Sequence, residues 1–310
     1  MTDQPERPAL IDPAALRRQR DRASAGFDQV NYLKTAVADR IMDRIDTIRR
    51  DLPRVLEVGC HTGELTEMLM DCDKITTVNA FDPSPQMVAR TEARFQGRGG
   101  VDVAVAGFDD VPFDGEMFDA VISAYALHWA NDLPGSLIQL RQRLKPDGVL
   151  LVALAGGETL NHLRNCLAVA ESDIMGGMSP RVLPMGDIRD MGGLIGRAGL
   201  TMPVADSDTI TVTYPDLLTV LMELRAMGEG NAMTDRLKSM TPRSVFLRAA
   251  ELYRDQYGTP DGRIAVSFEI ITLTGWAPDA SQPQPLKPGS AKVRLADALG
   301  VSETDPEASS

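Results

Sequence analysis

Short apolar runs and segments of helical spacing alternate along the middle of the chain. Five of these runs are predicted to be strands: RVLEVG (54–59), TTVNAFD (76–82), VDVAVAG (101–107), FDAVISAY (118–125) and GVLLVALAGG (148–157). Strands that alternate with helices in this way predict a parallel sheet with helices on both of its faces.

Two helices are predicted ahead of the sheet, within an N-terminal extension over residues 1–50. The first is ALRRQRDRA, and the second is NYLKTAVADRIMDRIDTIRR. Apolar residues recur at helical spacing in the second: Leu33, Val37, Ile41 and Ile45. We expect these helices to lie over an edge of the domain.

The alternation breaks down after Gly157. A helix and a loop rich in glycine and proline follow, and we interpret residues 158–186 as a lid inserted over the cleft. Two later runs, DTITVTY and IAVSFEIITLTGW, are expected to complete the sheet as an antiparallel pair, which gives a main domain at 51–276. Proline, serine and acidic residues dominate 277–310, which we predict to be a mobile tail. The whole pattern predicts an α/β fold: a doubly wound, Rossmann-like sheet, mostly parallel, with an antiparallel strand at the C-terminal end.

The net charge of the chain bears on the kind of macromolecule that it can bind. Forty-four acidic residues against 32 basic ones give a formal net charge of -12, which argues against binding to a nucleic-acid backbone. The three cysteines, Cys60, Cys72 and Cys166, have no paired metal-ligand spacing and are expected as reduced thiols. The N-terminus has no apolar signal core, and no apolar run approaches the roughly 20 residues of a membrane-spanning helix. We therefore expect a cytoplasmic protein with at most peripheral membrane contact.

A glycine turn, framed by Gly59 and Gly63, follows the first predicted strand. In doubly wound sheets, ligands lie outside the carboxyl ends of the strands. Asp82 ends the second predicted strand, where a carboxylate can accept hydrogen bonds from both hydroxyls of a ribose. The turn is not G-x-G-x-x-G, which disfavours a nicotinamide dinucleotide. The alternative is that the glycines only permit the turn and that Asp82 caps the next helix.

With Glu57 ahead of it, the turn LEVGCHTG resembles the first motif of the class I S-adenosylmethionine-dependent methyltransferases. FDAVISAYALHW and LKPDGVLLVA resemble the fourth and fifth strands of that family with their adjoining turns. The resemblance implies S-adenosylmethionine as cofactor and places Gln86 and Met87 near its adenine. The predicted cofactor contacts are Glu57, Gly59, His61, Gly63, Asp82, Gln86, Met87 and Asp109.

One position departs from the pattern of that family. The acid that often contacts the adenine amine after the third strand is replaced here by Gly107 and Phe108. Either Asp109 or Asp110 is expected to substitute for it, so the resemblance supports the ribose contacts more firmly than the adenine contacts.

Blocks outside this common core resemble a narrower family, the arginine hydroxylases with a methyltransferase fold that take part in respiratory complex I assembly. The likeness runs from about residue 14 to residue 293, and its blocks include LHWANDLPGSL, LKPDGVLLVALAGGETLNHLR, GGMSPRVLP, GGLIGRAGL, VTYPDLLTVLMELRAMGEGNA, YRDQYGTPDGRIAVSFEIITLTGW and KPGSAKV. It implies a protein substrate, an iron–sulfur subunit of complex I, and a bacterial counterpart of the mitochondrial factor.

His61 occupies the middle of the glycine turn, where nucleotide-binding loops usually carry glycine. Histidine tolerates left-handed backbone geometry, so the turn can still form. One interpretation has the imidazole pointing to solvent or packing beside the methionine moiety of the cofactor, and the other makes it catalytic. His61 and His128 could also face each other across the cleft and bind iron, but no H-x-D/E motif supports this, and we predict no metal site.

Tyr125 and His128 follow the fourth strand and are the predicted catalytic residues. A base assists methyl transfer when the acceptor carries a proton, and both side chains are placed to act there. The alternative is that Tyr125, Leu127 and Trp129 pack in the core and that His128 caps a turn. His162, in the inserted helix, is expected to be a packing or surface residue.

Three functions are consistent with these observations. The leading one is an enzyme that modifies a protein side chain, by arginine hydroxylation or methylation, during complex I assembly. The second is a small-molecule or malonyl-acyl-carrier O-methyltransferase, since that family shares the core motifs. The third is a non-catalytic assembly chaperone that retains the cofactor site only for stability.

Overall fold

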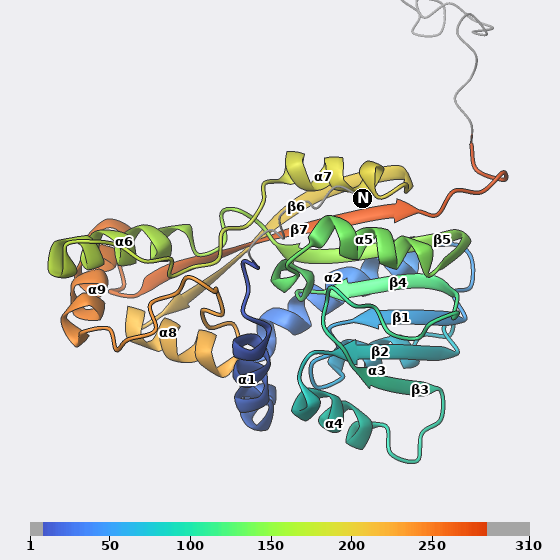
Figure 1. The fold of residues 1–310 in the computed structure, drawn as a ribbon, viewed down its shortest axis with the longest axis horizontal. Helices are drawn as coiled ribbons and strands as arrows, with labels where there is room; N and C mark the ends of the chain where they lie inside the picture. The colour runs from blue at the N-terminus through green and yellow to red at the C-terminus, as the bar shows by residue number, and fades with distance from the viewer. Residues whose placement is uncertain (1–8, 284–310) are drawn as a thin grey trace, which may run out of the picture. The chain divides into compact units, whose positions relative to one another are not determined.

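The computed structural model describes residues 9–283. Those up to Pro278 form one compact unit around a seven-stranded sheet, and the few after it belong to a second unit. The strand order is β3-β2-β1-β4-β5-β7-β6 (Figure 1). The strands are β1 (Arg54–Val58), β2 (Thr77–Asp82), β3 (Val101–Val105), β4 (Phe118–Ala124), β5 (Leu144–Ala155), β6 (Thr201–Tyr214) and β7 (Ile264–Trp276).

Helices connect and cover these strands. The α-helices are α1 (Pro13–Ala23), α2 (Tyr32–Thr47), α3 (Glu64–Met70), α4 (Pro85–Arg94), α5 (Leu133–Gln142), α6 (Asn161–Met175), α7 (Ile188–Arg197), α8 (Leu217–Ala226) and α9 (Arg243–Tyr257). Two short 3₁₀ helices, η1 (Ser24–Gln29) and η2 (Leu127–Trp129), follow α1 and β4.

Strands β1 to β5 pair in parallel, whereas β7 runs antiparallel to both β5 and β6. The predicted fold class is therefore confirmed. Strand order reverses at β1, which pairs with β2 on one side and β4 on the other. The carboxyl ends of these strands lie where a doubly wound sheet binds its ligand.

Successive residues of the central strands face two different cores. In β1, Val55 packs into the core that includes α2, α3, α6, α8 and α9, whereas Leu56 and Val58 pack into the core that includes α1, α5 and α7. A parallel strand with both faces covered must be apolar at nearly every position. This requirement is why the central strands appear in the sequence as continuous apolar runs.

The sequence pattern predicts the N-terminal helices over an edge of the domain, whereas α2 lies over the middle of the sheet. α1 contacts α4 and α8, and α2 contacts β4 and β5 in the middle of the sheet. The reason is the apolar stripe of α2, whose residues Leu33, Val37, Ile41 and Ile45 are fully buried in the larger core. Figure 1 shows α1 between α8 and α4, at the end of the sheet where β1 and β2 terminate.

The segment that we interpreted as an inserted lid contains α6 and the loop that follows it. α6 packs side by side with α9, away from β1 to β3 (Figure 1). The predicted mobile tail falls mostly on residues 284–310, which lie outside the described residues. Between residues 9 and 283, no helix combines the length and the hydropathy needed to cross a membrane.

The start of β6 differs from the prediction. β6 begins at Thr201, several residues earlier than predicted. Its added residues pair with β7 but are mostly polar or exposed, so the apolar pattern did not reveal them.

Candidate functional site

The turn after β1 depends on glycine at Gly59. Its φ is +81°, and a Cβ atom at this position would lie 2.2 Å from the Cβ of Ala126. Gly63 also has a positive φ, +89°, and it forms the N-cap of α3. Both glycines are therefore required by the backbone itself, whatever the turn binds.

His61 adopts the left-handed backbone that the sequence analysis allowed, with φ of 50°. Its side chain is only 4% exposed, and its ring stacks on Phe27 of η1 at 5.5 Å with an interplanar angle of 8°. Burial, assisted by the nearby Lys34 and Arg20 cations, holds the pKa of His61 well below its usual range. The imidazole is therefore neutral, and its Nε2 is buried without a hydrogen-bond partner among the described residues.

Asp82, the predicted ribose acceptor, is fully buried at the end of β2. Its Oδ2 accepts hydrogen bonds from Arg20 Nη1 at 2.6 Å and from the His61 backbone N–H at 3.3 Å, and Oδ1 accepts from the Ser84 N–H at 2.9 Å. Burial raises the pKa of Asp82, and the Arg20 guanidinium opposes that rise. Arg20 therefore holds the carboxylate that the sequence assigns to a cofactor.

Further contacts secure the α1–η1 segment against this part of the molecule. The Arg20 guanidinium lies 5.1 Å from the centre of the Phe108 ring, and its Nη2 is buried without a partner among the described residues. Asp21 accepts a 2.6 Å hydrogen bond from Ser84 Oγ, and Arg90 pairs with Asp28. The N-terminal extension thus closes over the turn and over Asp82.

Glu57 lies at the base of the same turn and is 1% exposed. Its Oε2 accepts a 2.6 Å hydrogen bond from Thr66 Oγ1 on α3. Burial raises the pKa of Glu57 to about 8, with Thr66 acting in the opposite direction. Glu57 is therefore largely protonated at neutral pH and connects β1 to α3.

The remaining predicted cofactor contacts lie in different surroundings. Gln86 is exposed, whereas Met87 is buried against Ala23 and Phe27 of the N-terminal segment. Asp109 accepts hydrogen bonds from the backbone N–H groups of Asn131 and Asp132, at 3.1 and 2.8 Å. Its carboxylate thus stabilises the segment that leads into α5.

The predicted catalytic residues Tyr125 and His128 lie together after β4. Their rings are 4.8 Å apart, and both side chains are buried. His128 Nε2 lies 3.2 Å from Glu229 Oε2, and Trp129 Nε1 donates to the same oxygen at 2.8 Å. Burial lowers the pKa of His128 and raises that of Tyr125 well above its usual value, so both side chains are neutral at pH 7.

Lys34 completes this cluster from α2. Its Nζ donates to Glu229 Oε1 at 2.9 Å and to the Tyr125 carbonyl oxygen at 2.7 Å. Burial lowers the pKa of Lys34 to about 8. Burial also acts to raise the pKa of Glu229, but Lys34 and His128 outweigh it and hold that pKa well below the usual range. At neutral pH the two residues form a buried ion pair.

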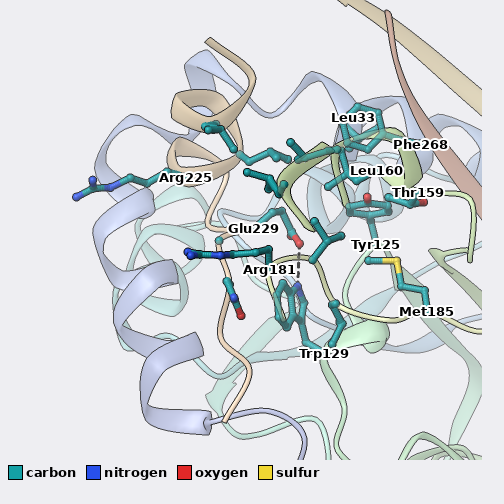
Figure 2. A pocket seen from close by; sticks show the side chains of 18 of the residues that line it. Leu33, Tyr125, Trp129, Thr159, Leu160, Arg181, Met185, Arg225, Glu229 and Phe268 are labelled. Carbon is teal, nitrogen blue, oxygen red and sulfur yellow. Dashed lines mark hydrogen bonds between the residues drawn. The ribbon is translucent and has the colours of Figure 1, made fainter. Parts of the chain in front are cut away.

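A cavity of about 200 Å³ lies beside this cluster (Figure 2). Tyr125, Trp129 and Glu229 line it, and residues of the inserted segment, such as Thr159 and Met185, form another part of its wall. Its remaining lining is Leu33, Leu160, Leu163, Leu167, Arg181, Val182, Leu183, Leu221, Leu224, Arg225, Gly230, Asn231, Phe246 and Phe268.

The cationic and the anionic side chains that line the cavity lie on different sides of it. Figure 2 shows the guanidinium groups of Arg181 and Arg225 on the side away from Tyr125, whereas the Glu229 carboxylate points toward the Trp129 ring. Arg181 is neutralised by Glu171, with a 2.7 Å contact from its Nη2 to Oε1. The described lining therefore presents a single carboxylate, that of Glu229, near the rings of Tyr125 and Trp129 in a largely apolar cavity.

The two histidines of the iron hypothesis have different partners, since His61 stacks on Phe27 and His128 bonds to Glu229. Among residues 9–283, no three His, Cys, Asp or Glu side chains are grouped as metal ligands. His162 stacks on Tyr257 at 3.7 Å, which confirms it as a packing residue.

Sequence reasoning missed Arg20, Phe27, Lys34 and Glu229. Lys34 left a signal, because it is a charged residue next to Leu33 on the apolar stripe of α2. The other three lie in segments without strong periodicity, so only the tertiary structure reveals them.

Comparisons with known proteins show to which family the chain belongs. The model of the methyltransferase domain family matches residues 56–152. The arginine hydroxylase NDUFAF5 of Danio rerio is 37% identical over 93% of this chain and 89% of its own length. A malonyl-[acyl-carrier protein] O-methyltransferase of Halorhodospira halophila is 31% identical over 86% of this chain and 88% of its own.

Solved structures give the same fold. The YcgJ protein of Bacillus subtilis superposes with a TM-score of 0.55 at 15% identity, covering 78% of this chain and 98% of its own. At that identity the likeness concerns the fold alone, whereas the match to NDUFAF5 extends over nearly the whole chain. The chain therefore belongs to the family of the arginine hydroxylase NDUFAF5 and is an enzyme of the S-adenosylmethionine-dependent methyltransferase superfamily.

Proposed function

We propose that this enzyme binds S-adenosylmethionine beside the turn after β1 and modifies an arginine side chain of a protein substrate. Hydroxylation, which the name of the NDUFAF5 relative specifies, is the reaction that we expect first. The sequence resemblance leads us to propose an iron–sulfur subunit of respiratory complex I as the substrate and complex I assembly as the process. The unpaired cysteines Cys60, Cys72 and Cys166 favour the cytoplasm as the compartment.

The residues around the turn fit this cofactor chemically. Asp82 offers a carboxylate for the ribose hydroxyls, and in the closed arrangement its oxygens accept hydrogen bonds from Arg20 Nη1 and from the backbone N–H groups of His61 and Ser84. Asp82 itself has no exposed surface and is held by Arg20. We therefore propose that the α1–η1 segment moves to admit the cofactor and that Arg20 then releases Asp82. Bound S-adenosylmethionine supplies an activated methyl group, so the same site could support methylation.

The Glu229 carboxylate in the lining of the cavity is the observation that carries the proposal for the substrate. A long cationic side chain would place its methylene groups along the aliphatic wall and its charged end near Glu229 and the rings of Tyr125 and Trp129. Lys34 already balances Glu229, but its pKa of about 8 allows it to lose its proton when a second cation arrives.

His128 lies next to two residues that line the cavity, with its ring 4.8 Å from that of Tyr125 and 5.5 Å from that of Trp129. Its Nε2 lies at Glu229, so the neutral imidazole donates there and leaves Nδ1 as an acceptor. This Nδ1 is buried and has no partner among the described residues. We propose that His128 Nδ1 accepts a proton from the substrate. The Tyr125 hydroxyl, which stays protonated, donates a hydrogen bond to the substrate.

The test uses the iron–sulfur subunit from the same source, incubated in air with the enzyme, S-adenosylmethionine and a reductant such as ascorbate, and analysed by peptide mass spectrometry. Hydroxylation would add one oxygen atom of dioxygen to an arginine, while the second oxygen atom leaves as water formed with two electrons and two protons from the reductant. Methylation would instead add a net CH2 unit. We expect the modification to be lost with Glu229→Gln, while the circular dichroism spectrum stays native. An unmodified subunit in every condition would contradict the proposal.

A malonyl-acyl-carrier methyltransferase is the second candidate, because such an enzyme is also a relative. Its substrate carries a carboxylate, which Glu229 would repel inside the cavity. Methylation of malonyl-acyl-carrier protein by the purified enzyme would nevertheless replace the leading proposal. A chaperone role would be indicated if variants without cofactor binding still supported complex I assembly.

A further inference from the structure

An open groove of about 1070 Å³ adjoins the cavity and shares Arg225 and Gly230 with it. α1 and η1 supply one wall, through residues such as Arg22 and Gly26. α8 and the loop after it supply the rest: Met222, Arg225, Ala226, Gly230, Leu237 and Ser239. A chain lying in the groove would therefore run next to the cavity proposed to receive the acceptor side chain.

The charge of this groove is opposite to that of the protein as a whole. The chain carries a net charge of -12, yet the charged residues lining the groove are both cations, Arg22 and Arg225. Both are exposed, and neither forms an ion pair with any residue of the described range. By contrast, Arg17 of the same helix lies 3.8 Å from Asp21. Two unneutralised cations in one groove of an acidic protein select an acidic partner.

Apolar and hydrogen-bonding groups make the groove suitable for a polypeptide. The Met222 side chain is 64% exposed there, and methionine adapts its shape to varied partners. Gln19 also lines the groove, and its Nε2 donates to the Asn231 carbonyl oxygen at 2.9 Å. The exposed Ser239 adds a hydroxyl that can donate or accept a hydrogen bond along an extended chain.

We propose that this groove binds an acidic polypeptide segment of the protein substrate, with acidic residues beside the arginine that enters the cavity. The arginine in this inference rests on the proposed function. The acidic segment does not, because it is inferred from the two cations of the groove, Arg22 and Arg225. An acyl carrier protein is the other acidic macromolecule that could occupy it, and the test treats it as the competing outcome.

The test measures fluorescence anisotropy of three short labelled peptides, each with one central arginine flanked by aspartate, asparagine or lysine. We expect the aspartate peptide to bind about tenfold more tightly than the asparagine peptide, with the difference shrinking at high salt. The double variant Arg22→Glu/Arg225→Glu should lose that preference and favour the lysine peptide. Arg49→Glu reverses an exposed charge next to the start of β1, at the other end of the strands, and is the matched control, expected to bind like the wild type.

Two results would overturn the inference: equal binding of the aspartate and lysine peptides to the wild type, or an unchanged preference in the double variant. Tighter binding of holo-acyl carrier protein than of any peptide, lost in the same variant, would assign the groove to that protein instead. Replacing the central arginine by glutamine separates the groove from the cavity. If that peptide binds equally well, the proposed arginine substrate fails while the groove assignment stands.

Discussion

Two buried ion pairs, Arg20–Asp82 and Lys34–Glu229, lie at the two parts of the site and differ in what they leave open. At the turn after β1, the Arg20 guanidinium contacts Asp82 directly, and both side chains are at most 1% exposed. Beside η2, Glu229 lines a cavity of about 200 Å³, and Lys34 pairs with Glu229. The Arg20–Asp82 pair is enclosed at the turn after β1, whereas the Lys34–Glu229 pair lies beside a cavity.

The N-terminal helices supply the cation of each pair. Arg20 and Lys34 both precede residues 56–152, which match the methyltransferase domain family. In the proposed function, α1 controls access to Asp82 through Arg20, and α2 sets the charge beside the acceptor cavity through Lys34. If this account is correct, changes at Asp82 and Arg20 will affect the cofactor, and changes at Glu229 will affect the protein substrate.

The largest effect is expected from Asp82→Ala, which leaves the Arg20 guanidinium buried without a counter-ion. Removing one partner of a buried pair costs about 3–5 kcal/mol of unfolding free energy. The double variant Arg20→Met/Asp82→Ala removes the uncompensated charge and should recover much of that loss. Urea unfolding of both variants measures the difference, and equal stability of the two would show that the pair is not buried in solution.

The next largest effect concerns pH and Glu57. Its pKa in the folded protein, about 8, exceeds the ordinary glutamate pKa of 4.5, so its contribution to stability is complete below pH 4.5 and is lost as the pH rises toward 8. Relative to Glu57→Gln, the wild type should lose on the order of 4 kcal/mol of unfolding free energy across that interval. Unfolding curves at several pH values test this, and parallel pH profiles for the two proteins would contradict the buried, protonated state.

A moderate effect is expected for Arg20→Met on cofactor affinity. Without the guanidinium, Asp82 is free to accept hydrogen bonds from the ribose, and we expect S-adenosylmethionine to bind about tenfold more tightly than to the wild type. Calorimetric titration measures the affinity, with Arg17→Met on the exposed face of α1 as the control. Weaker binding by Arg20→Met would instead make Arg20 a direct contact of the cofactor.

The smallest effect is expected for His61→Gly. Glycine relieves a left-handed backbone strain of about 1 kcal/mol, but it removes the stack on Phe27, worth about 0.5–1.5 kcal/mol. Stability should therefore change by less than about 1 kcal/mol. Removing the buried ring also makes room, so cofactor affinity should rise slightly, and a clear fall would show that His61 binds the cofactor. Thermal unfolding and calorimetry provide the two readouts.

The sequence predicted the parts of the molecule that local pattern determines. Buried parallel strands appear as apolar runs, and Gly59 appears because a side chain there would collide with Ala126. The ion pairs that cover Asp82 and that set the charge beside the cavity could not be predicted from local pattern. Arg20 lies 62 residues from Asp82, and Lys34 lies 195 residues from Glu229. Such pairs form only once α1 and α2 pack onto the domain, and no spacing rule connects them.

Above all, we propose that the region closed by Arg20 and Asp82 binds a cofactor. The decisive experiment is calorimetric titration of the wild type with S-adenosylmethionine, beside the folded double variant Arg20→Met/Asp82→Ala. We predict micromolar binding to the wild type and no measurable binding to the double variant. No binding to the wild type, or equal affinity in both proteins, would contradict the claim.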